Sequence, residues 1–369
     1  LSGLDIGGKE RVALELARLG RAAGRDDRLM VFDSAFRDAV RDLDPGDVPV
    51  ELIERGAGLD LAFARRAAAR LVELRPSAVH AHNDTGIFYG SLARALTTPR
   101  LGSRRPRLVA TFHARPIHAT RGARWSTRAA CLAASSVTAV SEDLRSYLRR
   151  EGWCGRCDVI GNGIDLDRFA PDRSGSAWRE RLGISPDVPL IVHLGRLDPI
   201  KRHADLIAAH AYLREGGTAV ETVAAGDGVE RPRVEQAART LPGFHHLPGV
   251  QDVPGLLGEA DLLVLCSAFE ATPMVVIEAL AAGLPVVATD VGGLPAMVAA
   301  DPSGQAISLV PPEAPERLAD AIRALLDEPE GDHQARRAAA RAAAQAYDWK
   351  PVLARYEALY RVARGTPER

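Results

Sequence analysis

The sequence predicts an α/β protein with two doubly wound domains, each a parallel sheet with helices on both faces. Short apolar runs alternate with segments whose apolar residues recur at helical spacing, both before and after a polar segment at 171–189. A chain of 369 residues has room for roughly two domains of about 150 residues. Its apolar content of 46% is ordinary for a protein with full cores.

The first half supplies six expected strands with helices between them, such as the helix at 59–74. The strands are 29–32, 48–53, 78–82, 107–112, 136–140 and 158–160. A domain of this type opens with a strand before its first glycine turn, but only Leu1 and Ser2 precede Gly3. We therefore expect most of the first strand to be missing from this sequence.

The second half repeats the alternation. Its expected strands are 190–194, 221–225, 262–266, 285–288 and 306–309. The run from Leu262 to Cys266 is apolar without interruption, which is typical of a parallel strand buried on both faces. From Trp349 to Val362, aromatic residues and leucines are spaced for a helix that packs on a large surface.

Two glutamates follow this buried strand. Glu270 lies at its carboxyl end, where ligands bind in doubly wound sheets. Pro273 suits the first turn of a helix that carries Glu278. The N–H groups near Met274 and Val275 would face an anion there, and Glu278 would accept hydrogen bonds from ligand hydroxyls. The pattern indicates a site for a phosphorylated sugar or a nucleotide.

Cationic side chains follow the strand at 190–194. It ends at Gly195 and Arg196, and Lys201 comes five residues after Arg196. Two cations at the tip of one strand, beside the glutamates in the same sheet, would neutralise a diphosphate. The two strand ends together therefore predict one anion-binding site.

Motifs across nearly the whole chain share their order and spacing with one known family. They are Gly7-Gly8-Lys9-Glu10-Arg11, Val79-His80-Ala81-His82, Thr111-Phe112-His113, Val140-Ser141-Glu142, Asn162-Gly163-Ile164-Asp165 with Phe169, Gly195-Arg196-Leu197 with Lys201, Gly226-Asp227-Gly228, Pro248-Gly249-Val250, and the Glu270 to Glu278 pair with Gly283-Leu284-Pro285-Val286-Val287-Ala288-Thr289. The sequence thereby resembles the retaining GT-B glycosyltransferases of glycosyltransferase family 4. The resemblance implies two Rossmann-like domains that face each other across a cleft. It places an acceptor-side domain at 1–170, a nucleotide-sugar-binding domain at 171–348, and a C-terminal helix at 349–369 that packs back on the first domain.

The resemblance also implies an activity. A hexose-type sugar would move from a nucleoside diphosphate, with UDP expected, to an acceptor hydroxyl with retention of configuration and without a metal or other cofactor. The setting would be bacterial cell-envelope, exopolysaccharide or glycolipid biosynthesis. The residues at the catalytic positions are His113, Arg196, Lys201 and Glu270. The residues at the donor-binding positions are Gly7, Gly8, Gly195, Val250, Thr272, Pro273, Met274, Val275 and Glu278.

Individual roles follow from the same resemblance. His113 would contact the donor sugar, Arg196 and Lys201 would stabilise charge on the leaving phosphate, and Glu270 would bind sugar hydroxyls or steady charge at the anomeric carbon. Glu278 would hold the ribose. Ala271 stands where the family usually has Gly, which leaves the identity of the sugar open.

Three other motifs do not support their usual functions. The segment from Gly3 to Lys9 has the spacing of a P-loop, but Glu10 stands where Ser or Thr would bind magnesium. Asp165-Leu166-Asp167 imitates a metal-binding Asp-x-Asp but lies partly inside the Asn-Gly-Ile-Asp motif. Gly226-Asp227-Gly228 lacks the third glycine of a dinucleotide fingerprint. The sequence therefore predicts neither an NTPase, nor a metal site, nor a hydride-transfer enzyme.

Charge is divided unevenly between the halves. Residues 1–165 contain 26 lysines and arginines against 20 acids, a net of +6, and the remainder contains 21 against 28, a net of −7. No Asp or Glu occurs from Thr85 to Ser141, whereas nine arginines lie from Arg94 to Arg128. Solvated helix faces explain part of this pattern. We interpret the interval as a surface for an anionic acceptor, lipid-linked or otherwise, or for a membrane.

The four cysteines are too scattered for a disulfide framework, and Cys154 and Cys157 are interpreted as residues of a surface loop. No signal peptide is visible, and no apolar run approaches the ~18 residues of a membrane-spanning helix. We expect a cytoplasmic protein, peripheral on the inner membrane face, with no nucleic-acid partner. Two alternatives stay open: a sugar-nucleotide epimerase with the same fold, and a non-catalytic nucleotide-sugar-binding protein.

Overall fold

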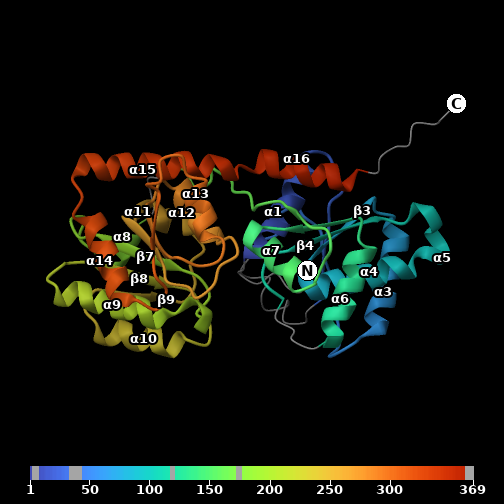
Figure 1. The fold of residues 1–369 in the computed structure, drawn as a ribbon, viewed down its shortest axis with the longest axis horizontal. Helices are drawn as coiled ribbons and strands as arrows, with labels where there is room; N and C mark the ends of the chain where they lie inside the picture. The colour runs from blue at the N-terminus through green and yellow to red at the C-terminus, as the bar shows by residue number, and fades with distance from the viewer. Residues whose placement is uncertain (2–7, 33–43, 117–120, 172–176, 362–369) are drawn as a thin grey trace. The chain divides into compact units, whose positions relative to one another are not determined.

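The computed structural model describes residues 1, 8–32, 44–116, 121–171 and 177–361. The chain forms two compact units (Figure 1). Unit 1 comprises Leu1–Gly163 and Lys350–Arg369, and unit 2 comprises Ile164–Trp349. Each unit has parallel sheets and helices, which confirms the predicted α/β class with two Rossmann-like domains.

Unit 1 contains two parallel sheets. The first pairs β1 (Leu29–Val31) with β2 (Val50–Leu52), and the second has the order β3 (Ala78–His82), β4 (Arg107–Phe112), β5 (Ser136–Ala139) and β6 (Asp158–Val159). Its helices are α1 (Gly8–Ala22), α3 (Leu61–Leu74), α4 (Asn83–Leu96), α5 (Thr98–Leu101), α6 (Arg121–Ala133), α7 (Glu142–Arg150) and α16 (Trp349–Tyr360).

Local sequence signals fix where these helices begin. The Asp60 carboxylate accepts a hydrogen bond from the Phe63 N–H at 2.8 Å and caps α3. Ser141 caps α7 in the same way, and acids lie in the first turn of α7 and arginines in its last turn, as the helix dipole favours. Such caps each stabilise a helix by about 1 kcal/mol.

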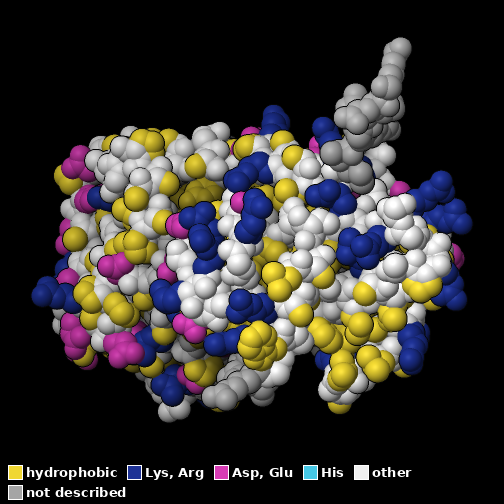
Figure 2. Space-filling view, turned by 45° about the vertical axis from the view of Figure 1, so that its right-hand side comes forward, with side chains coloured by type: hydrophobic (Ala, Val, Ile, Leu, Met, Phe, Trp, Pro, Cys, Tyr) yellow, Lys and Arg dark blue, Asp and Glu magenta, His cyan; other side chains and the backbone are white. Residues whose placement is uncertain are grey.

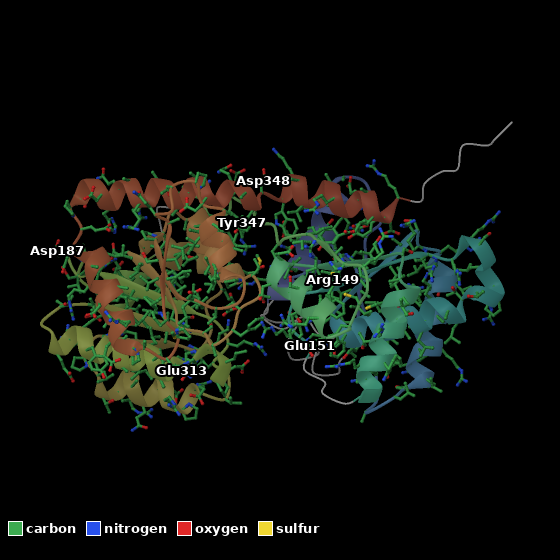
Figure 3. The ribbon with its side chains drawn as sticks, in the orientation of Figure 1. Arg149, Glu151, Asp187, Glu313, Tyr347 and Asp348 are labelled. Carbon is green, nitrogen blue, oxygen red and sulfur yellow. The ribbon has the colours of Figure 1, made fainter. Side chains whose placement is uncertain are left out.

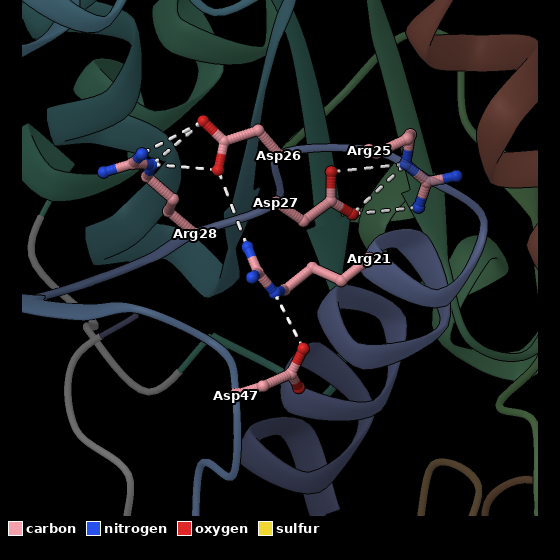
Figure 4. Close-up of polar contacts among 6 residues, drawn as sticks. All are labelled: Arg21, Arg25, Asp26, Asp27, Arg28 and Asp47. Carbon is pink, nitrogen blue, oxygen red and sulfur yellow. Dashed lines mark hydrogen bonds and ion pairs between the residues drawn. The ribbon is translucent and has the colours of Figure 1, made fainter.

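The last helix, α16, packs on unit 1 through polar contacts along its length. Arg107 Nε donates to the Leu359 carbonyl at 2.9 Å. Arg25 pairs with Glu357 and also donates to Asp27, within a group of ion pairs around the α1–β1 loop (Figure 4). The two chain segments that enter and leave unit 2 run side by side. The Ile164 N–H donates to the Tyr347 carbonyl at 2.7 Å, and Ile164 forms a parallel β-bridge with Asp348. Tyr347 and Asp348 are labelled in Figure 3.

Unit 2 is one parallel sheet with the strand order β12-β11-β10-β7-β8-β9. Its strands are β7 (Leu190–Leu194), β8 (Glu221–Ala225), β9 (Phe244–Leu247), β10 (Leu262–Leu265), β11 (Val286–Thr289) and β12 (Ile307–Val310). Its helices are α8 (Trp178–Leu182), α9 (His203–Glu215), α10 (Arg231–Thr240), α11 (Val253–Glu259), α12 (Met274–Ala281), α13 (Leu294–Ala299), α14 (Pro315–Leu326) and α15 (Glu330–Ala344). The order reverses between β7 and β10, which places the topological switch point of the sheet there.

The core of unit 2 explains its uninterrupted apolar runs. Leu190 and Val192 of β7 join the hydrophobic cluster on one face of the sheet, and Ile191 joins the cluster on the other. Side chains alternate between faces along a strand, so a sheet covered on both sides favours apolar residues at most positions. His193 of β7 is a buried exception, and its Nδ1 lies 3.0 Å from the Val264 carbonyl oxygen.

The structure differs from the expected elements in three places. β9 was not among the expected strands, because its Phe-His-His-Leu sequence lacks an apolar run. α8 lies in the segment interpreted as a polar separator, and it forms because Trp178 and Leu182 pack on the core. Cys154 and Cys157 are buried, not surface residues. Other strand ends shift by one or two residues. None of the described helices combines the length and the apolar character that crossing a bilayer requires.

Candidate active site

The switch point of unit 2 brings together two of the predicted site residues. Lys201 ends the 3-10 turn η2 (Pro199–Lys201) that follows β7, and Glu270 follows β10. Lys201 Nζ and Glu270 Oε1 lie 2.5 Å apart, and their side chains are 18% and 10% exposed. Because β7 and β10 are neighbours in the sheet, their carboxyl ends deliver the cation and the carboxylate to one place.

Hydrogen bonds between the two loops hold this pair. The Ala268 N–H donates to the Ile200 carbonyl at 2.7 Å, and Cys266 Sγ donates to the Lys201 carbonyl at 3.1 Å. Ser267 Oγ donates to Glu270 Oε1 at 2.6 Å. The carboxylate is thus oriented by a hydroxyl and an ammonium group together.

Two glycines allow neighbouring loops to approach the site. Gly226 has φ of +148°, and a Cβ there would lie 1.8 Å from the Gly195 carbonyl oxygen. Gly292 has φ of +57°, and a Cβ there would lie 1.8 Å from the Glu270 carbonyl oxygen. Only glycine fits either position, because a Cβ would overlap a carbonyl oxygen at both. At Gly226 the backbone conformation is also one that residues with a side chain rarely adopt.

Helix α12 begins beside Glu270. Pro273 precedes its first residue, Met274. The N–H groups of Met274 and Val275 have no carbonyl one turn earlier within the helix, so the helix start can bind an anion. Glu278 lies in the second turn and is 3% exposed. Thr272 lies in the loop between Glu270 and this helix.

Other predicted residues of unit 2 surround the Lys201–Glu270 pair in the sequence, but not all of them contact it. A Cβ built on Gly195 would lie 3.7 Å from Lys201 Cε, so the glycine lines the lysine side chain. Arg196 has a side chain that is 67% exposed and pairs with Asp198 at 3.0 Å, not with Glu270. Val250 is partly buried against the core in the loop between β9 and α11.

The predicted residues of unit 1 lie at the start of α1 and at the end of β4. Gly8 is exposed and begins α1, and Gly7 lies outside the described residues. His113 follows β4, and its N–H donates to Asn83 Oδ1 at 2.8 Å. His113 Nε2 lies 2.8 Å from His82 Nδ1. Among the residues that the structure describes, His113 Nδ1 is buried without a hydrogen-bond partner.

These histidines are neutral at physiological pH. Burial lowers the pKa of His113 to about 3, with the charge of Lys9 a smaller cause. Burial also lowers the pKa of His82 well below its usual value, with His80 and His113 as further causes. In the hydrogen bond between them, one ring therefore donates and the other accepts.

His80 has both ring nitrogens satisfied, as expected for a packed histidine. Its Nδ1 bonds to the Tyr360 hydroxyl and its Nε2 to Thr111 Oγ1, each at 2.7 Å. Its ring centroid lies 4.1 Å from that of His82. A continuous contact path thus runs from α16 through His80 and His82 to His113.

Sequence reasoning missed two polar contacts of the site. Ser267 comes directly after the strand run and three residues before Glu270, a spacing at which its hydroxyl can reach the carboxylate. The contact between His82 and His113 joins the ends of the parallel strands β3 and β4. Its only signal in the sequence was that each histidine stands at the carboxyl end of an expected strand.

Comparisons with known proteins agree with this arrangement. The family model for Glycosyltransferase Family 4 matches residues 6–168, and the model for Glycosyl transferases group 1 matches residues 188–328. EpsF of Bacillus subtilis, which is named as a glycosyltransferase, is 30% identical over 322 residues, 79% of this chain and 78% of EpsF. The GDP-mannose:cellobiosyl-diphosphopolyprenol alpha-mannosyltransferase of Xanthomonas campestris is 28% identical over 98% of this chain and 95% of its own.

Solved structures share the fold. A glycosyltransferase from Rickettsia africae superposes with a TM-score of 0.79 at 19% identity, over 96% of this chain and 94% of that one. Anabaena HepE in complex with UDP-glucose superposes with a TM-score of 0.78 at 24% identity, over 97% of both chains. The strand order, the residues at the strand ends and these matches lead to one conclusion: the chain belongs to the family 4, or group 1, glycosyltransferases and has their GT-B fold.

Proposed function

We propose that this glycosyltransferase moves a hexose-type sugar from a nucleoside diphosphate, UDP in the first instance, to an acceptor hydroxyl with retention of configuration. The observation that carries the proposal is the Lys201–Glu270 pair at the switch point of unit 2, next to the start of α12. That place offers a cation and helix N–H groups for a diphosphate, and a carboxylate for the sugar.

Donor binding would rearrange this ion pair. A donor diphosphate would attract the Lys201 ammonium group, and Glu270 would then accept hydrogen bonds from sugar hydroxyls while Ser267 keeps it oriented. Arg196 would exchange the Asp198 carboxylate for a phosphate oxygen. Glu278, from the second turn of α12, would hold the ribose.

The transfer needs one bond exchange at the anomeric carbon. The bond from that carbon to the phosphate oxygen breaks, and the acceptor oxygen bonds on the same face. The acceptor proton passes to the leaving phosphate oxygen. Lys201 and the start of α12 stabilise the charge that grows on the phosphate, so no metal ion is needed in this proposal. His113, with its unsatisfied Nδ1, would bind the sugar near the reacting carbon.

The acceptor is proposed to be anionic, such as a lipid-linked sugar phosphate on the cytoplasmic face of the inner membrane. The net charge of +6 in residues 1–165 supports this class. The Xanthomonas relative supports it as well, because its name gives a diphosphopolyprenol-linked acceptor. A role in cell-envelope, exopolysaccharide or glycolipid synthesis would follow.

A ligand screen tests the donor. UDP, GDP and ADP are compared by thermal shift, because a ligand at about 100 times its dissociation constant stabilises the folded state by roughly 2.7 kcal/mol. UDP should give the largest shift. A larger shift with GDP, the nucleotide in the name of the Xanthomonas enzyme, would indicate that the donor is a GDP-sugar and not a UDP-sugar.

Product analysis tests the reaction. Incubation of the preferred sugar nucleotide with and without lipid-linked acceptors should give a product of unchanged anomeric configuration only when an acceptor is present. Conversion of the donor alone into an epimer would favour the epimerase alternative, and binding without turnover on any acceptor would favour the non-catalytic one.

A further inference from the structure

A buried thiol contacts the loop that carries Lys201. Cys266 directly follows β10 and is fully buried. Its Sγ lies 3.1 Å from the Lys201 carbonyl oxygen and 3.3 Å from the Arg202 carbonyl oxygen, so the thiol can donate to both. Burial raises the pKa of the Cys266 thiol to about 12, and the group therefore remains a hydrogen-bond donor at physiological pH.

The chain turns sharply at Arg202, and we call residues 201–203 the Lys201 elbow. Arg202 has φ of +53°, in the left-handed region that residues with a side chain adopt uncommonly. The elbow separates the turn η2, which ends at Lys201, from α9, which begins at His203. A conformation of this kind persists where surrounding contacts hold it, and such conformations cluster at functional sites.

Ion pairs of Arg202 do not link the elbow to the carboxylate partner of Lys201. Arg202 pairs with Asp205, in the first turn of α9, at 2.6 Å. It also pairs at 2.9 Å with Glu313, whose side chain is 69% exposed (Figure 3). Oppositely charged side chains lie close together at several places on the surface in Figure 2, and exposed pairs of this kind contribute little to stability.

The thiol, in contrast, links the elbow to the segment that carries Glu270, since Cys266 is four residues before that glutamate. The Lys201 carbonyl belongs to the planar peptide group between Lys201 and Arg202. A hydrogen bond to this carbonyl fixes the orientation of the peptide group beside which the Lys201 side chain leaves the backbone. The hydrogen bond from the Ala268 N–H to the Ile200 carbonyl adds a second link between the same two segments.

We propose that Cys266 is a positioning residue for Lys201. Its thiol holds the Lys201 elbow, and the elbow keeps the lysine ammonium group where the donor diphosphate would bind. This inference rests on the proposed function and adds that a buried thiol sets the position of the cation on which that function depends. A hydroxyl group could replace the thiol as a donor, whereas an alkyl group of similar size could not.

Substitutions that separate hydrogen bonding from packing test the proposal. Cys266→Val fills the space without a donor, and Cys266→Ala lacks a donor in a smaller side chain. Both should lower the turnover of sugar transfer by about 10- to 100-fold, since a misplacement of about 1 Å costs on the order of 100-fold. Cys266→Ser should keep most of the wild-type turnover, because its hydroxyl group can donate.

Cys131→Ala is the matched control. Cys131 is a buried thiol of unit 1, and burial raises its pKa to about 12 as well. This variant should keep wild-type turnover. The thermal shift caused by UDP is measured for every variant, and a shift in the Cys266 variants shows that unit 2 is folded. Their Michaelis constants for the donor should change less than turnover does, because the charge that Lys201 stabilises grows toward the transition state.

A double variant makes the test specific to Lys201. Turnover of Lys201→Ala, Cys266→Ala should equal that of Lys201→Ala alone, because the thiol then has no ammonium group to position.

Full turnover in Cys266→Ala, a loss in Cys266→Ser as large as that in Cys266→Ala, or independent losses in the double variant would each overturn the inference. If Lys201→Ala lowers turnover in the same series, the proposed function stands without it. A Lys201→Ala enzyme as active as wild type would overturn both the proposed role of Lys201 and the inference.

Discussion

At the scale of single residues, the contact between Lys201 and Glu270 would link donor binding to sugar transfer in the proposed function. A cation that leaves a carboxylate for a phosphate interacts most strongly when the phosphate carries most charge, which is in the transition state. Lys201→Ala should therefore raise the activation free energy of sugar transfer by about 3 kcal/mol, which lowers turnover. Its effect on the binding free energy of the donor should be smaller. Steady-state kinetics measure both. The exposed Lys350→Ala is the control, and a Lys201→Ala enzyme with near-native turnover would disprove the assignment.

Substitutions of Glu270 and Glu278 should change different kinetic constants. If Glu278 binds ribose, it contributes equally to the ground state and the transition state, so Glu278→Gln should mainly raise the Michaelis constant for the donor. Glu270 lies beside Lys201, and Glu270→Gln should mainly lower turnover. Measurement of kcat and KM for each variant decides the matter, and the reverse partition would mean that the two roles are exchanged.

His82 should act through His113. Loss of the 2.8 Å hydrogen bond in His82→Leu leaves His113 Nε2 without its partner, so turnover should fall while nucleotide binding by unit 2 is retained. An asparagine side chain can place a polar atom close to the position of Nδ1, and His82→Asn should restore much of the loss. Turnover and UDP affinity are measured for both variants. Equal losses in His82→Leu and His82→Asn would exclude a positioning role.

The position of a site residue could be predicted from the sequence where it depends only on a strand that is close by in the chain. Glu270 and Lys201 each follow an apolar strand run within a few residues, so the position of each at a strand end could be predicted from the sequence. Their direct contact could not, because it depends on β7 and β10 being neighbours in the sheet, although the paired residues Ile191 and Leu262 are 71 positions apart in the sequence. The contact of His82 with His113 depends in the same way on the pairing of β3 with β4.

At the scale of elements, strands covered on both faces were predictable and short irregular elements were not. β7 and β8 agree with their predicted bounds because burial on both faces requires an apolar residue at nearly every position. β9 contains two histidines in four positions. α8 has five residues, too few for helical periodicity to be recognised in the sequence. The N–H groups of Trp178 and Arg179 bond to the distant Glu259 carboxylate, a tertiary contact that no local pattern contains.

The start of α12 has a consequence for metal dependence. In the proposed function, the helix end and the Lys201 ammonium group would supply the positive charge that stabilises the diphosphate, in place of a divalent cation. We therefore expect sugar transfer to proceed at an unchanged rate in EDTA. The assay compares purified enzyme in EDTA with enzyme in magnesium or manganese. Loss of activity in EDTA and its recovery with either ion would contradict the expectation.

At the scale of the whole molecule, buried histidines should make stability depend on pH. Burial lowers the pKa of His193 to about 3 and that of His203 to about 4. A histidine in the unfolded chain titrates near about 6.5. Below that pH the unfolded chain binds protons that the folded chain does not, so the free energy of unfolding is highest above about pH 6.5 and falls as the pH decreases toward 4.

The expected slope is up to about 1.4 kcal/mol per pH unit for each such histidine. His203→Leu should reduce the slope of the unfolding free energy against pH by the contribution of one proton. The substitution breaks no hydrogen bond, because both ring nitrogens of His203 lack a partner among the described residues. Urea denaturation of wild type and variant between about pH 4.5 and 7.5 measures the slopes. Parallel curves would show that His203 is protonated equally in the folded and unfolded states.

The membership of α16 in unit 1 has a consequence for biosynthesis. Unit 2 is one continuous segment, whereas unit 1 needs both Leu1–Gly163 and the residues from Lys350 onward. A ribosome therefore completes the sequence of unit 2 before it has supplied Tyr360, the partner of His80. During translation, the nascent first segment must wait for the last helix while the domain encoded between them can already fold. A messenger truncated after the codon for Trp349 would thus yield a complete unit 2 attached to an incomplete unit 1.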